Sequence, residues 1–221
     1  AIKLKSNYVE AHLKLGEILA DQGRYKEASI SEWNAIKIDP SFEFIKLYRK
    51  NAKLIHKTGF FVFSYTIFNH FRPIIEINPN FFEILVPDNV DKKMIHKIQD
   101  DLANKDIRIR SYKELVENNL FYKQLVSNHA SHEINVIDDK NNIQIKRTVP
   151  IIKLLGKKNI RLMYAAGKIK WNLSYWNKYY DGILCYGPYH EDKFKVRHKI
   201  ATSQMVYPRF DKYYNPGFKR D

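Results

Sequence analysis

The residues of this chain that could do chemistry follow short apolar runs. His129 comes just after such a run, and an imidazole there could bind an anion or act as a base near neutral pH. Gly167 and Lys168 could present a backbone amide and an ammonium group to a phosphate. Arg209 also follows an apolar run, where a guanidinium can bind a phosphate through two hydrogen bonds.

A turn and an acidic residue complete the candidate substrate-binding set. The run 183–186 stops at Gly187 and Pro188, and Tyr186, Gly187 and Pro188 form a turn that could line a cleft. Asp211 stands two positions after Arg209, and the two could instead form an ion pair that fixes the chain locally. For His129 the alternative is a polar histidine in an ordinary loop.

The apolar runs predict the elements that would position these residues. Each run is short, rich in residues that favour strands, and ends at a proline, glycine or polar residue. Strands are predicted at 60–65, 82–86, 107–110, 122–126, 160–164, 183–186 and 204–207. Helical stretches between them indicate an α/β fold with a Rossmann-like parallel sheet, whose ligands bind beyond the carboxyl ends of the strands.

The segments between the strands carry further predictions. Ser111 is expected to cap a helix over 112–118, and helices are expected at 90–103, 149–156, 171–179 and 190–197. A loop is expected at 66–72 and a hairpin around 138–142. An amphipathic helix is expected over 42–57.

The N-terminal segment resembles a tetratricopeptide repeat. Leu15, Gly16, Ala28, Ala35 and Pro40 fall at the spacing of that repeat, with small residues where two helices would cross. Residues 1–57 are therefore predicted to be a helical, repeat-like segment that could bind a protein partner. Residues 58–221 are predicted to form the Rossmann-like domain.

The C-terminal part resembles the CDP-glycerol glycerophosphotransferase-like families of GT-B type. The resemblance lies in the segments 176–189 and 206–211, where the second reads Val-Tyr-Pro-Arg-Phe-Asp and lacks the leading Gly of the family element. It implies an acceptor-side domain of a transferase that moves a glycerol-phosphate or sugar unit from CDP-glycerol or a nucleotide sugar. The acceptor would be a surface polysaccharide or a lipid-linked molecule.

Two departures from the family pattern affect the expected activity. The family's Trp-His-Gly element is expected near Tyr164–Lys170, where Ala165 or Ala166 stands in place of the histidine, so the catalytic base would be His129, His70 or His190. The chain also ends where the donor domain of the family would begin. We therefore expect 1–221 alone to be inactive, because transfer needs donor and acceptor held together.

Composition limits the remaining possibilities. The net charge of +14 favours anionic partners, including an anionic membrane face, and the single cysteine suits a reducing compartment such as the cytoplasm. Metal-ligand spacing, phosphate loops and RNA-binding signatures are absent from the sequence, so no metal, cofactor or nucleic acid is predicted. A nucleotide-sugar epimerase of the same architecture and a non-catalytic repeat scaffold remain alternative functions.

Overall fold

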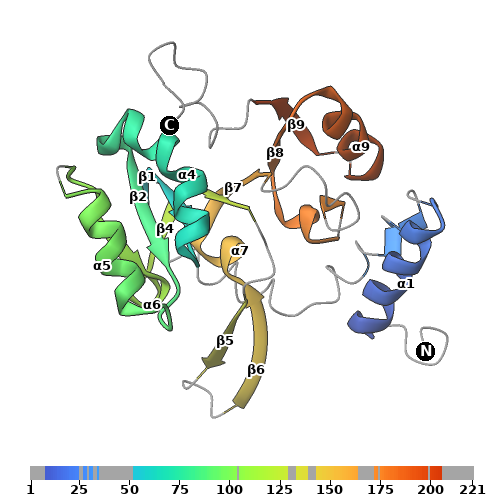
Figure 1. Ribbon diagram of the computed structural model, residues 1–221. Helices are drawn as coiled ribbons and strands as arrows, with labels where there is room; N and C mark the ends of the chain where they lie inside the picture. The colour runs from blue at the N-terminus through green and yellow to red at the C-terminus, as the bar shows by residue number, and fades with distance from the viewer. Residues whose placement is uncertain are drawn as a thin grey trace.

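A seven-stranded parallel sheet organises the computed structural model, which describes residues 8–24, 27–28, 30–31, 34, 52–103, 105–128, 133–138, 143–163, 172–173, 175–198 and 200–205 (Figure 1). The strand order is β3-β2-β1-β4-β7-β8-β9, and every neighbouring pair is parallel. The strands are β1 (Lys53–Phe61), β2 (Phe82–Val86), β3 (Ile109–Ser111), β4 (Leu120–Ser127), β7 (Gly156–Leu162), β8 (Gly182–Cys185) and β9 (Ala201–Gln204). The predicted Rossmann-like α/β class is confirmed.

The central strands are buried on both faces, as crossover connections require. Phe60 and Val62 pack on one face with Phe68 and Phe71 of α4 (Tyr65–Ile77). Phe61, which lies between these two residues in the chain, packs on the other face. The helices of the first face are α4 and α5 (Lys92–Asp101), and those of the second are α6 (Tyr112–Glu117), α7 (Ile151–Leu155) and the 3-10 helix η3 (Tyr175–Tyr179).

Local sequence signals explain where several of these helices begin. The Ser64 hydroxyl accepts a hydrogen bond from the amide of Ile67 at the start of α4. Asp91 caps α5 through the amide of Lys93, and Ser111 caps α6 through the amide of Glu114. The predicted cap at Ser111 is confirmed, and α5 begins at Lys92, two residues after the predicted start at 90.

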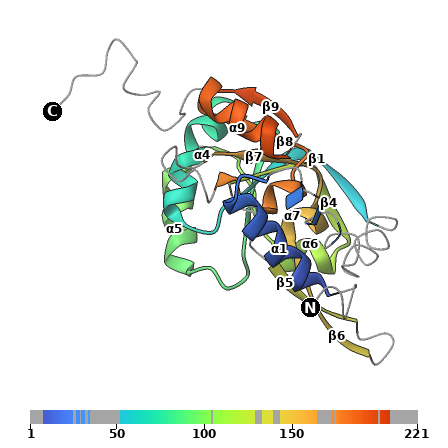
Figure 2. The same ribbon diagram turned by 90° about the vertical axis from the view of Figure 1, so that its right-hand side faces the viewer.

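An antiparallel hairpin interrupts the connection between β4 and β7. It consists of β5 (Glu133–Asp138) and β6 (Ile143–Pro150), and it extends away from the sheet in both views (Figures 1 and 2). The hairpin predicted around 138–142 is therefore confirmed. At the β9 edge of the sheet, α9 (Pro188–His198) connects β8 to β9. The 3-10 helix η1 (Pro79–Phe81) precedes β2.

The N-terminal segment contains α1 (Val9–Asp21), which is followed by Gly23 at φ +75°. Residues 27–28, 30–31 and 34 are also helical, and Ser31 donates a hydrogen bond to the backbone oxygen of His12 in α1. Two helices therefore contact each other here. The tetratricopeptide repeat itself stays a prediction, since 35–51 lies outside the described residues.

Several predictions along the chain differ from the structure. The last strand, predicted at 204–207, is β9 at Ala201–Gln204. Residues 53–57 belong to β1 instead of a helix, because Leu54 and Ile55 pair with β4. Residues 66–72 belong to α4 instead of a loop. The helix continues through Pro73 because Ile67, Phe71 and Ile75 form one apolar side that packs on the sheet.

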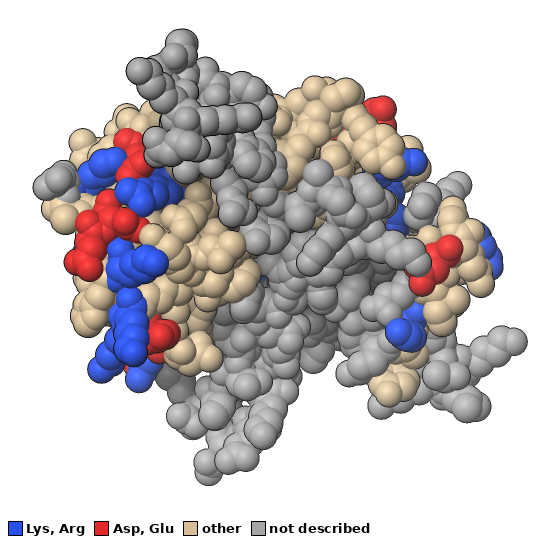
Figure 3. All heavy atoms as spheres, viewed as in Figure 1, with Lys and Arg blue, Asp and Glu red and all other residues tan. Residues whose placement is uncertain are grey.

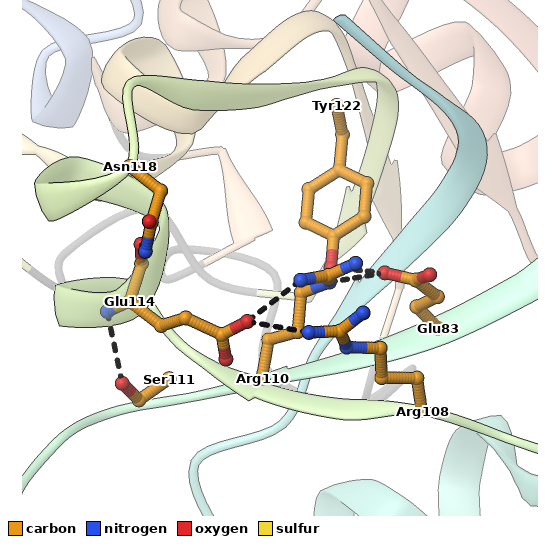
Figure 4. Close-up of polar contacts among 7 residues, drawn as sticks. All are labelled: Glu83, Arg108, Arg110, Ser111, Glu114, Asn118 and Tyr122. Atoms are coloured by element: carbon orange, nitrogen blue, oxygen red, sulfur yellow. Dashed lines mark hydrogen bonds and ion pairs between the residues drawn. The ribbon is translucent and has the colours of Figure 1, made fainter. Parts of the chain in front are cut away.

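A buried ion network joins three strands on the face covered by α6 (Figure 4). Arg110 on β3 donates to Glu83 on β2 at 2.7 Å and to Glu114 on α6 at 2.6 Å. The hydroxyl of Tyr122, on β4, donates to the same Glu83 carboxylate at 3.2 Å. Burial and the Glu83 carboxylate raise the pKa of Tyr122, so this hydroxyl stays protonated.

Charged side chains are mixed on the outer surface of α4 and α5. In Figure 3, Lys and Arg alternate with Asp and Glu on that side of the molecule. Arg72 pairs with Glu76 at 2.9 Å and with Asp101 at 3.1 Å, and Lys105 pairs with Glu76. The excess of positive charge therefore does not form a uniformly basic surface over these two helices.

Candidate functional site

The strand order places a switch point between β1 and β4. From β1 the chain continues outward through β2 and β3, whereas β4, β7, β8 and β9 extend the sheet on the other side. The connections that leave β1 and β4 therefore diverge. In open parallel sheets, the crevice beyond the carboxyl ends of two such strands is where ligands bind.

On the β1 side, the switch point is followed by the N-terminus of α4. Val62 and Phe63 lead from the strand to Ser64, whose hydroxyl caps the helix. The first turn of α4 contains no acidic side chain. The partial positive charge of the helix end is therefore not neutralised by its own first turn.

On the β4 side, the strand ends in two buried polar residues. The Ser127 hydroxyl lies 2.6 Å from the hydroxyl of Tyr180, on the face that η3 covers. The backbone oxygen of Asn128 accepts a hydrogen bond from Arg161 Nε at 3.3 Å. Asn128 is 2% exposed, and its Oδ1 has no hydrogen-bond partner among the described residues.

Arg161 on β7 joins the segments around this end of the sheet. Besides Asn128, its guanidinium donates to the backbone oxygen of Asn172 at 2.6 Å, to Asn172 Oδ1 at 2.8 Å and to Asn177 Oδ1 at 2.5 Å. It also lies over the ring of Phe194 in α9. Burial lowers the pKa of Arg161 to about 10, so the guanidinium is still charged at neutral pH.

The ends of β7 and β8 are tied together at the carbonyl of Met163. This oxygen accepts a short hydrogen bond from the hydroxyl of Tyr186 and lies 2.8 Å from Nε2 of His70. His70 is fully buried on α4. The contact therefore joins α4, the residue after β7 and the residue after β8.

The turn after β8 is built around Gly187. Its φ of +87° is in the left-handed region, which a residue without Cβ adopts without strain. Pro188 is the first residue of α9, where its missing N–H costs no hydrogen bond. Nδ1 of His190 lies 3.1 Å from the backbone oxygen of Tyr186.

Glu191 in the first turn of α9 has a structural explanation. It accepts hydrogen bonds from Thr202 and Gln204 of β9 and pairs with Lys195. These donors lower the pKa of Glu191 to about 2, so it is ionised at neutral pH. Cys185 is buried and its thiol pKa is raised by burial to about 11, so the thiol is protonated at neutral pH.

The structure places part of the predicted site. Tyr186, Gly187 and Pro188 lie past the carboxyl end of β8, on the edge that the sequence predicted. The other candidates lie outside the described residues; these are His129, Gly167, Lys168, Arg209 and Asp211. His129 nevertheless follows Asn128 directly in the chain, at the end of the central strand β4.

Sequence reasoning missed Asn128, Arg161 and Ser64. The available signal for Arg161 was a charged residue between Ile160 and Leu162, inside an apolar run. A charge at such a position needs partners within the protein. Among the described residues, no cluster of three or more His, Cys, Asp or Glu could hold a metal ion, and no helix is long and apolar enough to cross a membrane.

Together the strand order, the crossover helices and the switch point define a Rossmann-like α/β domain. No family model matches the chain, and no curated protein matches it. Among solved structures, the chain is similar to the wall teichoic acid polymerase TagF with CDPG, at 13% sequence identity and a TM-score of 0.42. The match covers 89% of this chain and 51% of that chain, so this chain spans about half its length. At these values the likeness carries no argument about function.

Proposed function

We propose that this chain forms the acceptor-side half of a transferase of GT-B type. The full protein would move a glycerol-phosphate or sugar unit from CDP-glycerol or a nucleotide sugar to a surface polysaccharide or a lipid-linked acceptor. The observation that carries the proposal is the switch point between β1 and β4, where β1 leads into the N-terminus of α4 and β4 ends shortly before His129 in the sequence. The resemblance of 176–189 and 206–211 to the transferase families supports it further.

In this proposal His129 is the base. The acceptor hydroxyl attacks the phosphorus or the anomeric carbon of the donor, its proton passes to the imidazole, and the nucleotide leaves with the electrons of the broken bond. Gly167, Lys168, Arg209 and Asp211 would contact the phosphate groups or fix the chain around them.

Arg161 would support this chemistry from within the fold. Its Nε holds the backbone oxygen of Asn128, so it fixes the peptide from which His129 follows. Its other hydrogen bonds anchor the guanidinium to Asn172 and Asn177. Arg161 is thus a positioning residue in this proposal and does not touch substrate.

The test is a transfer assay with the full-length protein that carries this chain. Radiolabelled CDP-glycerol, UDP-glucose and UDP-N-acetylglucosamine would each be incubated with membranes that supply acceptors. We expect label to enter the membrane fraction from one donor, and His129→Gln to reduce the rate by about 100-fold or more. Arg108→Gln, an exposed surface change, should leave the rate unchanged.

Three outcomes would contradict the proposal. Isomerisation of a free UDP-sugar without an acceptor would indicate an epimerase. Full activity of His129→Gln would remove the proposed base. The absence of turnover with every donor, together with capture of a protein partner by residues 1–57, would favour a scaffold.

A further inference from the structure

The switch point contains a buried amide oxygen that lacks a partner. Asn128 is 2% exposed, and its Oδ1 makes no hydrogen bond within the described part of the chain. Leaving a buried acceptor unsatisfied costs about 1–3 kcal/mol. Such atoms in a native fold need an explanation, and one explanation is a ligand that supplies the missing donor.

The pleat of the sheet places the Asn128 side chain on the same face as α4. Val126 pairs with Phe60 of β1, and both side chains pack with Phe68 and Phe71 of α4. Successive side chains of a strand alternate between faces. Asn128 directly follows β4, and continuing this alternation by one residue past the strand puts its side chain on that face. Ser127 follows the same rule, because it contacts Tyr180 on the opposite face.

The N-terminus of α4 begins at the end of the adjacent strand. The amides of Tyr65 and Thr66 precede the first bond within the helix, which Phe68 donates to the backbone oxygen of Ser64. Thr66 is exposed, so solutes reach this helix end from solvent. A helix of 13 residues with no acidic side chain in its first turn favours an anion there.

From these two features we infer a subsite for a phosphate that carries a neighbouring hydroxyl group. The phosphate oxygens would accept hydrogen bonds from the amides of Tyr65 and Thr66. The hydroxyl would donate to Asn128 Oδ1. This inference rests on the proposed function, in which the acceptor binds at the switch point, but its test needs no turnover.

The test is an NMR titration of the isotope-labelled chain. The probes are sn-glycerol 3-phosphate, inorganic phosphate and glycerol, and the readouts are the amide signals of Tyr65 and Thr66. Both phosphates should shift these signals in a saturable way. The hydroxyl bond should make glycerol 3-phosphate bind about 5-fold more tightly than inorganic phosphate, as expected for one ordinary hydrogen bond.

Asn128→Ala isolates the hydroxyl contact. This change should make the two phosphates bind equally, with the affinity for inorganic phosphate unchanged. Removing Oδ1 breaks no hydrogen bond with the described residues, but truncating this buried side chain leaves a cavity, so the melting temperature is measured alongside the titration. Asn118→Ala is the control, because Asn118 lies in the turn just before β4 begins, at the other end of the strand, and it should keep the 5-fold difference.

A second variant covers the case in which Asn128→Ala does not fold. Asn128→Asp preserves the shape and places a carboxylate in the subsite, so it should weaken both phosphates. Absence of a saturable shift in the wild-type chain, or an undiminished 5-fold difference in Asn128→Ala, would overturn the inference.

Cytidine monophosphate serves as a fourth probe, because its ribose also combines hydroxyls with a phosphate. Binding that is tighter than that of glycerol 3-phosphate and depends on Asn128 would overturn the assignment to the acceptor. The proposed subsite and the proposed transferase function can be contradicted independently. If the chain binds the phosphates as predicted but the protein has no transfer activity, only the proposed transferase function is contradicted. If transfer occurs without this binding, only the proposed subsite is contradicted.

Discussion

The ring of Tyr122 lies against the backbone of Gly59. A Cβ at Gly59 would lie 2.9 Å from two ring carbons of Tyr122, closer than real Cβ contacts. Gly59 is on β1 and Tyr122 is on β4, and the Tyr122 hydroxyl donates to Glu83 on β2. The glycine therefore allows a side chain from one strand to pass over its neighbour and bind the strand beyond.

Gly59→Ala should lower the free energy of unfolding by about 1–3 kcal/mol, as for other overpacked sites. The ring cannot move away freely because its hydroxyl is held by Glu83. Urea denaturation measures the change. Gly182→Ala is the matched control, since the nearest side-chain atom to a Cβ there lies at 3.4 Å. Equal losses at both positions would contradict the contact.

Glu83→Gln should destabilise the protein by about 3 kcal/mol, because it leaves the buried charge of Arg110 with less compensation. The residual pair between Arg110 and Glu114 limits the loss. Glu117→Gln breaks an exposed pair with Lys113 and should cost less than about 0.5 kcal/mol. A small effect of Glu83→Gln would mean that the network contributes little to stability.

Acid should destabilise the protein through His198. Burial lowers the pKa of His198 from 6.5 to about 2, so between these values the unfolded chain binds a proton that the folded protein does not. The free energy of unfolding should therefore fall as the pH falls below 6.5, with His198 contributing at most about 1.4 kcal/mol per pH unit. His198→Asn should flatten this dependence between pH 6 and 4, whereas His96→Asn, an exposed change on α5, should not. Parallel profiles for the His198 variant and wild type would contradict the prediction.

Gly187→Ala tests backbone strain alone. Nothing lies within 4 Å of a Cβ at this position, but the φ of +87° is unfavourable for alanine. We expect a loss of about 1 kcal/mol in thermal unfolding. Gly187→Asn should lose less, because asparagine tolerates the left-handed region better. If alanine cost nothing, the turn would be able to adopt another conformation.

The sequence allowed the sheet to be predicted because its strands end at strong signals. Pro87 ends β2, Gly187-Pro188 follows β8, and each signal comes after a short apolar run. Alternating helical stretches then implied parallel pairing. The wrong predictions have one cause: at 53–57 and 66–72, tertiary packing decided between two patterns that the local sequence allowed.

The site was less predictable because the contacts of its described residues depend on which strands and loops lie next to each other in the fold. The turn at Tyr186 and Gly187 could be found from strand ends alone. The roles of Asn128 and Arg161 arise from contacts between strands and loops distant in the chain, which no local pattern records. The unpartnered oxygen of Asn128 is visible only when its neighbours are known.

Both edge strands of the seven-stranded sheet, β3 and β9, are short. β3 contains three residues and β9 contains four, and the residues of β9 are Ala-Thr-Ser-Gln. Glu191 further occupies the side chains of Thr202 and Gln204. Short, polar edge strands offer few unpaired backbone groups to another chain. Edge-to-edge aggregation is therefore disfavoured at both sides of this sheet.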